Sequence, residues 1–139
     1  MKGLSISMKR YIKAIYELAG NGMGVRISDI AAKVGVTRAS ACLAMKTLQK
    51  KELVYRDADS LVFLTKEGEY QAILALDKVA IIRNFLHDML HIKYEIAHTE
   101  ACAIESVISA ETFCSLCRFT RRKCIGGCYV KTVSPPREG

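Results

Sequence analysis

The fold is decided by residues 25–55, which read VRISDIAAKVGVTRASACLAMKTLQKKELVY. Apolar residues recur at helical spacing on both sides of Gly35, which predicts one helix over residues 29–34 and a second over residues 38–51. Gly35 stands where the chain must turn tightly between them. Two short helices joined by such a turn form the helix-turn-helix pattern, whose second helix is typically a DNA-recognition helix.

Hydroxyl residues predict where these helices begin. Ser28 precedes the first helix and Thr37 precedes the second, and a hydroxyl there accepts a hydrogen bond from an otherwise unpaired backbone amide. After the second helix, β-rich runs at residues 53–55 and 61–64 flank a polar turn and predict a hairpin. A hairpin that directly follows a recognition helix is the wing of a winged helix-turn-helix domain.

The remainder of the chain is predicted to be helical. One helix precedes the helix-turn-helix, a long amphipathic helix follows the hairpin, and two more come after it: residues 7–18, 65–90, 94–108 and 109–119. A helix as long as the one predicted over residues 65–90 is a natural strut between two copies of a chain. The fold class is therefore expected to be mainly α.

The charge is distributed unevenly along the 139 residues, whose net charge is +7. Residues 1–56 hold 11 Lys and Arg against 3 Asp and Glu, residues 57–113 hold 4 against 10, and residues 114–139 hold 6 against 1. A basic N-terminal third predicts a polyanionic partner. A membrane surface would instead favour one basic amphipathic helix, whereas this charge spreads over several elements.

Neither a membrane span nor a signal peptide is evident, so we expect a cytoplasmic protein without membrane contact. Six cysteines in that reducing compartment argue against a disulfide scaffold. Four of them form a C-x2-C-x6-C-x3-C motif: Cys114, Cys117, Cys124 and Cys128. This density is compatible with a structural zinc ion, with an iron–sulfur cluster, or with reduced or redox-switching thiols that hold no metal.

The sequence also resembles a known family. The runs SMKRYIKAIYEL (7–18), the stretch quoted above, LTKEGEYQAI (64–73), RNFL (83–86) and HTEACAIESVIS (98–109) occur in the order typical of the diphtheria toxin repressor and manganese transport regulator family. The resemblance implies the compact form without an SH3-like domain. It implies a winged helix-turn-helix DNA-binding domain (1–65), a helical dimerisation domain (66–110) and a cysteine-rich C-terminal segment (111–139).

By the same resemblance, the second helix of the helix-turn-helix faces double-stranded DNA. The residues expected to face the major groove or its phosphates are Thr37, Arg38, Ala39, Ser40, Cys42 and Leu43. The cations expected to add phosphate contacts are Arg26, Lys46, Lys50 and Arg56. The assignment of the first set to the major groove agrees with helix-turn-helix geometry, in which the start of the recognition helix meets base edges. Cys42 is also compatible with a small packed residue.

Part of the family's metal site is retained. His98, Cys102 and Glu105 recur at i, i+4 and i+7, which places imidazole, thiol and carboxylate on one stripe of one helix. Such groups bind transition metals, so these three residues are a candidate residual site. Cys102 is equally compatible with a small buried core residue.

The other family ligand positions differ. Ser106 and Val79 stand where the family has histidines, Arg10 and Lys13 replace ligands on the first helix, and Arg83 replaces a carboxylate on the long helix. Fixed cations beside a divalent ion are unfavourable, so we expect the Mn(II) or Fe(II) site to be lost.

Two hypotheses follow for the remaining ligands. Either Arg10 or Arg83 pairs with Glu105 in place of the ion, or His98 and Cys102 still bind a metal weakly.

These patterns lead to one interpretation with two alternatives. The chain is interpreted as a homodimeric DNA-binding regulator of metal or redox homeostasis, a repressor by resemblance, with the cysteine motif as sensor or structural metal site. One alternative is a protein-binding adaptor that uses a winged helix and a structural zinc. The other is a thiol oxidoreductase using Cys114 and Cys117, but no βαβ pattern surrounds that pair, and an enzyme is not expected.

Overall fold

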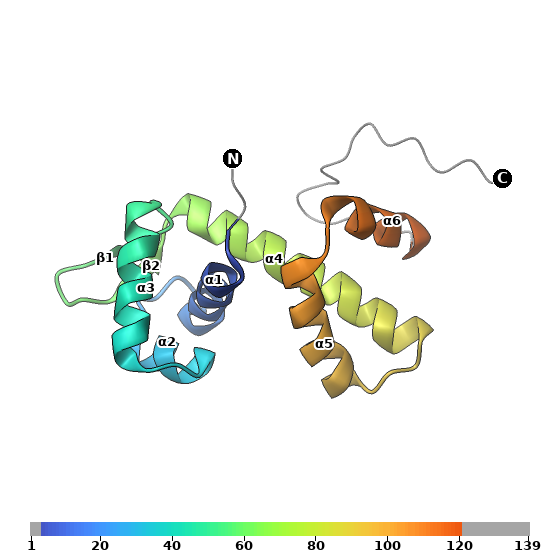
Figure 1. Cartoon of the computed structure of the whole chain (residues 1–139). Helices are drawn as coiled ribbons and strands as arrows, with labels where there is room; N and C mark the ends of the chain where they lie inside the picture. Colours follow the sequence, from blue (N-terminus) through green and yellow to red (C-terminus); the bar gives the residue numbers. More distant parts are fainter. Residues whose placement is uncertain (1–3, 121–139) are drawn as a thin grey trace. The chain divides into compact units, whose positions relative to one another are not determined.

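The computed structural model describes residues 4–120 (Figure 1). The elements follow in the order α1 (Ile6–Ala19), α2 (Ile27–Val34), α3 (Arg38–Lys50), β1 (Val54–Arg56), β2 (Val62–Leu64), α4 (Lys66–Asn84), a π-helical turn η1 (Phe85–Met89), α5 (Tyr94–Val107) and α6 (Ala110–Thr120). The predicted fold class is confirmed: the chain is mainly helical, with one small antiparallel sheet. Contacts divide it into two units between Ala75 and Leu76, inside α4.

The first unit is built on the apolar faces of α1, α2 and α3. Ile12, Ile15, Ile30, Met45 and Leu48 are each at most 1% exposed and belong to one core cluster. Helix α1 packs on α2, and α2 packs on α3; the three helices are labelled in Figure 1. The helical spacing that predicted these elements therefore corresponds to the faces that they bury.

The turn between α2 and α3 has the predicted chemistry. Gly35 adopts a left-handed conformation, with φ of 81°, and its N–H donates to the carbonyl of Ala31 at 2.9 Å. Thr37 then caps α3, since its Oγ1 accepts a hydrogen bond from the Ser40 N–H at 3.1 Å. The predictions for Gly35 and Thr37 are both confirmed.

The predicted cap at Ser28 is wrong. Helix α2 begins two residues earlier than predicted, at Ile27, and its N-cap residue Arg26 makes no side-chain capping hydrogen bond. The carbonyl of Arg26 instead accepts from the N–H groups of Asp29 and Ile30. Ile27 is only 4% exposed, so its burial in the core draws this residue into the first helical turn.

The wing is a hairpin in which Tyr55 pairs with Phe63. Their rings stack with centroids 5.2 Å apart, the type of cross-strand aromatic pair that stabilises short sheets. Val25 adds a third, one-residue strand, because it exchanges backbone hydrogen bonds with Val62 at 2.9 and 2.8 Å. This one-residue strand was not predicted from the sequence.

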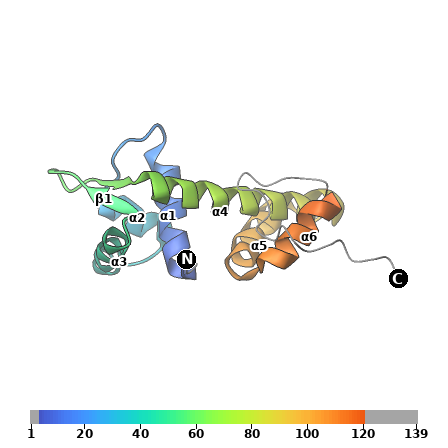
Figure 2. The same ribbon diagram turned by 90° about the horizontal axis from the view of Figure 1, so that it is seen from above.

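Helix α4 is continuous across the division between the two units (Figure 2). The long helix predicted over residues 65–90 is present, but its last turn, η1, has π-helical hydrogen bonding. His91 follows with a positive φ of 57°, which ends the helix. None of the helices within residues 4–120 combines the length and apolarity that a membrane crossing requires.

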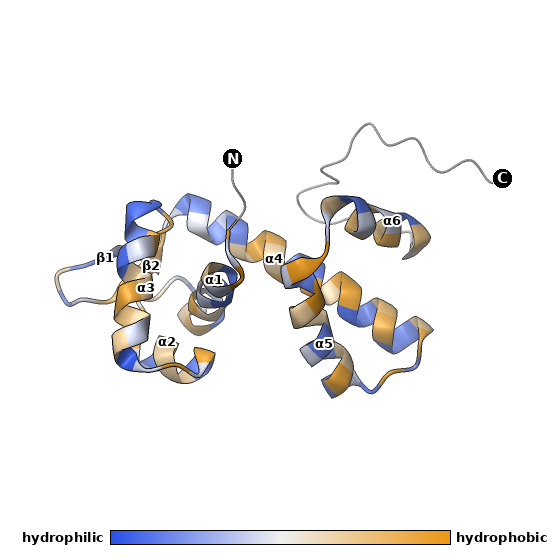
Figure 3. Cartoon of the chain, in the orientation of Figure 1, coloured by the Kyte–Doolittle hydropathy of each residue, from blue (hydrophilic) through white to orange (hydrophobic). Residues whose placement is uncertain are grey.

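The second unit packs α5 and α6 with the C-terminal part of α4. Its core contains Val79, Ile82, Ala101 and Phe113, each at most 2% exposed. Polar and apolar residues alternate along these helices, as the colouring in Figure 3 shows. Ser109 caps α6 as predicted, with its Oγ accepting from the Thr112 N–H at 3.1 Å.

Candidate nucleic-acid interface

The recognition helix α3 has one buried face and one exposed face. Ala41, Met45 and Leu48 are buried in the first unit's core. Most of the predicted DNA-facing residues are exposed: Arg26, Thr37, Arg38, Ala39, Ser40, Leu43, Lys46 and Lys50. Cys42 and Arg56 are half-buried, and Cys42 packs against the core cluster. Eight of the ten residues assigned to DNA are thus exposed, and α3 turns its opposite face to the core.

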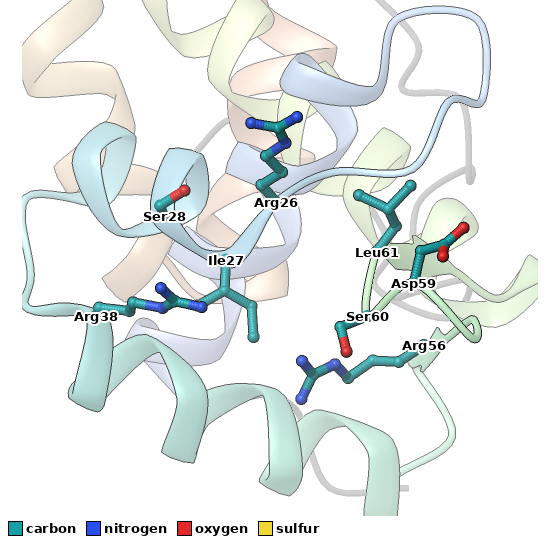
Figure 4. Close-up of a pocket in the computed structure, with 8 residues that line it drawn as sticks. All are labelled: Arg26, Ile27, Ser28, Arg38, Arg56, Asp59, Ser60 and Leu61. Atoms are coloured by element: carbon teal, nitrogen blue, oxygen red, sulfur yellow. The ribbon is translucent and has the colours of Figure 1, made fainter.

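Three of the predicted cations come together at one hollow in the surface. Arg26 precedes α2, Arg38 opens α3 and Arg56 ends β1, yet all three line this arginine hollow. The remaining lining residues come from the start of α2 and from the turn of the wing: Ile27, Ser28, Asp59, Ser60 and Leu61. Figure 4 shows Arg38 and Arg56 extending toward one another across the hollow, whereas Arg26 and the carboxylate of Asp59 point away.

Arg56 has an unmet donor at this place. Its Nε is buried and has no hydrogen-bond partner in the part of the chain that the structure describes. A buried donor without an acceptor is costly, so an anionic oxygen that entered the hollow would be bound favourably. The guanidinium groups of Arg38 and Arg56, which extend toward one another across the hollow, make it suited to phosphate.

The wing turn contributes residues that the sequence interpretation did not single out. Asp57 organises this turn, because its Oδ1 accepts hydrogen bonds from the N–H groups of Asp59 at 3.0 Å and Leu61 at 2.9 Å. Ser60 adopts a positive φ of 63° between them. This is the side-chain-mimicked turn that aspartate favours, and the run Asp57-Ala58-Asp59-Ser60 was the available signal for it. The turn brings Ser60 and Leu61 to the hollow.

The candidate metal residues on α5 are only partly brought together. His98 Nε2 lies 4.0 Å from Cys102 Sγ, whereas Glu105 is buried and 2% exposed. Residues 4–120 contain no group of three or more His, Cys, Asp or Glu side chains arranged to hold a metal ion. Of the three candidate ligands, the structure thus brings His98 and Cys102 into contact with each other.

His98 lies beside an aromatic ring, which in turn lies beside a cation. The Tyr94 ring lies parallel to the His98 ring, with centroids 6.3 Å apart, and the Arg83 guanidinium lies 5.1 Å from the centroid of Tyr94. Arg10, on α1, donates to the carbonyl of Val34 at 2.9 Å. Arg83 and Arg10, two of the residues predicted to stand at family ligand positions, thus make contacts within the protein.

The cysteine motif is divided by the limit of the described residues. Cys114 and Cys117 lie on α6, are 1% and 2% exposed, and point to the interior, where Cys117 packs in the core with Phe113. Cys124 and Cys128 lie outside the described residues. The structure thus places the first two thiols on one buried helix face.

Comparison with known proteins covers both units. The family model described as "Iron dependent repressor, metal binding and dimerisation domain" matches residues 65–123. The transcriptional regulator MntR of Escherichia coli O157:H7 is 31% identical over 112 residues, which are 81% of this chain and 72% of MntR. The diphtheria toxin repressor of Corynebacterium glutamicum is 27% identical over 111 residues, which cover 80% of this chain.

The chain spans about half the length of that repressor, 49%. Among solved structures, the manganese regulator SloR superposes with a TM-score of 0.73 at 28% identity, covering 84% of this chain and 55% of SloR. ScaR with bound Zn²⁺ superposes with a TM-score of 0.71 at 26% identity, covering 87% of this chain and 56% of ScaR. The similarity therefore includes the winged helix-turn-helix and the helices that follow it.

Proposed function

Because the chain belongs to the iron- and manganese-dependent repressor family, we propose that it is a DNA-binding transcriptional regulator of metal or redox homeostasis and not an enzyme. The observation that carries this proposal is the arginine hollow beside the recognition helix, which gathers Arg26, Arg38 and Arg56. Residues 1–65 form the DNA-binding domain and residues 66–110 the dimerisation domain of a cytoplasmic homodimer. Its output is repression, by similarity to its relatives.

The arrangement of charges supports a division of labour on the duplex. Helix α3 enters the major groove with its N-terminal residues toward the base edges. Arg38 and Arg56 bind phosphate in the hollow at one end of the helix, and Arg26 binds phosphate outside the hollow. Lys46 and Lys50 bind phosphate further along the exposed face of α3. Phosphate contacts position the protein, whereas the side chains between them read the bases.

The salt dependence of DNA binding tests this function. The full-length chain is incubated with a pool of random-sequence duplexes, and the bound fraction is amplified through repeated rounds. Affinity for the selected duplex is then measured by fluorescence anisotropy at several salt concentrations. We expect enrichment of one sequence and a steep decrease in affinity with salt, since each neutralised phosphate contributes about −0.9 to the log–log slope. Binding without enrichment or salt dependence would favour the adaptor alternative.

DNA binding is proposed to be independent of Mn(II) and Fe(II) at the family site. His98 and Cys102 are in contact, but the described residues hold no third donor with them, and Arg83 lies over the neighbouring Tyr94. A fixed guanidinium over the ring that stacks on His98 opposes a divalent cation at that histidine electrostatically. The competing hypothesis, weak metal binding by His98 and Cys102, predicts metal that is lost when both are replaced by Ala.

The effector is proposed to act at the four-cysteine motif instead. Cys114 and Cys117 share one buried face of α6, which suits two ligands of a soft metal that the following residues complete. Zinc, an iron–sulfur cluster and a metal-free thiol switch remain the three chemistries for this motif. Anaerobic purification with metal and sulfide analysis and an optical spectrum distinguishes them, since only the cluster absorbs visible light.

The variants Cys114→Ser and Cys117→Ser, examined in the same way, should change metal content and regulation. The variants Cys124→Ser and Cys128→Ser test the other two cysteines of the motif in the same way. Operator binding that is unchanged between reducing and oxidising conditions, in a protein that contains no metal, would contradict a role for the motif.

A further inference from the structure

Leu43 is a large apolar side chain on the exposed face of the recognition helix. It is 66% exposed, although the opposite face of α3 is buried as deeply as any part of the first unit. It lies in the middle of α3, which is one unbroken helix from Arg38 to Lys50. The side chain thus projects from a rigid element toward the exterior.

The surroundings of Leu43 are polar and cationic. Ala39, Leu43 and Lys46 lie at i, i+4 and i+7 on one stripe of α3, and Lys50 continues it. Arg38, which lines the arginine hollow, stands at the N-terminal end of the same helix. An apolar side chain followed on its stripe by two lysines, Lys46 and Lys50, suits a surface that is itself anionic at its edges, as DNA is, and does not suit an apolar protein surface.

The chemistry of the leucine side chain limits what it can read in the major groove. It has no donor or acceptor, so it cannot bond the base-edge atoms of guanine, adenine or cytosine. The one apolar group that a base pair presents there is the C5-methyl group of thymine. We propose that Leu43 is a specificity-determining residue that packs against a thymine methyl group in each half-site, an inference that rests on the proposed function.

The test removes only the methyl group. In the duplex selected from the random pool, each thymine is replaced in turn by uracil, which keeps every hydrogen-bonding atom of the base. We expect one position in each half-site where this replacement lowers the affinity of the full-length chain about fourfold, since burial of one methyl-sized group is worth roughly this factor. The Leu43→Ala variant should bind the thymine and uracil duplexes equally.

A matched variant separates the methyl contact from general weakening. Lys46→Ala removes a neighbouring charge on the same stripe and should weaken binding to both duplexes while keeping the fourfold difference. Circular dichroism and urea unfolding of Leu43→Ala should match the unmodified chain, because an exposed side chain is replaced.

If Leu43→Ala keeps the full thymine–uracil difference, or if no thymine in the duplex is sensitive to uracil, the inference on Leu43 is overturned while the DNA-binding function stands. If no duplex is enriched and no salt-dependent binding is seen, the proposed function is overturned and the inference with it.

Discussion

Arg56 has a buried donor without a partner and is also a candidate for phosphate binding. Its Nε is buried without a hydrogen-bond partner among residues 4–120, and its guanidinium extends across the arginine hollow toward Arg38 (Figure 4). An unsatisfied buried donor costs free energy in the unbound protein. The free-energy cost of this donor is removed when an anion binds to it, so Arg56 stabilises the complex more than the free protein.

Arg56→Met should therefore separate stability from binding. We expect the free energy of unfolding to remain unchanged or to rise by up to about 1 kcal/mol, because the orphaned donor is removed. DNA affinity should fall, and the salt slope should become shallower by about 0.9, because one phosphate contact is lost. Urea unfolding and anisotropy titrations at several salt concentrations measure the two effects.

Arg118→Met is the control for this experiment. Arg118 is an exposed arginine of α6 that donates to Ser115 at 3.1 Å, far along the chain from the hollow. Its replacement should leave the salt slope unchanged. A loss of stability in Arg56→Met with an unaltered salt slope would contradict the phosphate role.

Thr37 provides a test of the cap of the recognition helix at the scale of the element. Its Oγ1 accepts from the Ser40 N–H and its hydroxyl donates to Ser40 Oγ at 2.9 Å. Thr37→Ala should lower the free energy of unfolding by about 1 kcal/mol. Thr37→Ser should lower it much less, because serine keeps the capping hydroxyl. Thermal or urea unfolding of the two variants checks this, and equal stability of both would argue against the cap.

Gly68 marks the place where α4 begins against the hairpin. It is buried, and a Cβ added to it would collide with the backbone carbonyl of Leu53. That junction is held by Thr65, whose N–H donates to the Leu53 carbonyl at 3.0 Å and whose Oγ1 accepts from the Gly68 N–H at 3.1 Å. Close approach of two backbone segments, not a turn, explains a glycine inside a helix here.

Gly68→Ala should accordingly be destabilising, against the usual trend for helices. Alanine at an unhindered helical glycine gains roughly 0.5–1 kcal/mol, but the collision with Leu53 should cost about 1–3 kcal/mol. Urea unfolding measures the difference, with Glu69→Ala on the exposed side of the same turn as control. A more stable Gly68→Ala variant would show that the junction relaxes freely.

The elements that the sequence predicted well are those with local causes. Thr37, Gly35 and Ser109 act on backbone groups within four residues, so their signals could be read directly. The start of α2 and the one-residue strand at Val25 were missed. Both depend on contacts with distant segments, since Val25 pairs with Val62. Local preference is regularly overridden by such tertiary contacts.

At the scale of the whole molecule, the proposed loss of the family's metal site predicts metal-independent DNA binding. Addition of Mn(II) or Fe(II), or removal of divalent ions with a chelator, should change affinity for the selected duplex by less than about twofold, since a ligand that does not bind shifts no equilibrium. Metal content of the purified chain is measured in parallel with the double variant His98→Ala, Cys102→Ala. A strong metal response that this double variant abolishes would contradict the prediction.

A homodimer should also leave its symmetry in the DNA that it selects. A twofold-symmetric protein with one recognition helix per subunit reads two half-sites separated by one turn of DNA, about 10 base pairs, or by a multiple of it. We expect an approximately palindromic selected sequence and a dimeric mass by light scattering. A single unrepeated half-site bound by a monomer would contradict the proposed dimer.

The sequence by itself determined the helix-turn-helix, the wing, the capped start of α3 and the two helices after α4, because each depends on the spacing and chemistry of neighbouring residues. It also identified the cations of the candidate interface, because charge is a property of composition. Only the tertiary structure decided that Arg26, Arg38 and Arg56 share one hollow. Their convergence depends on how separate segments pack, and burial of apolar surface between segments distant in the chain is not encoded in any one of them.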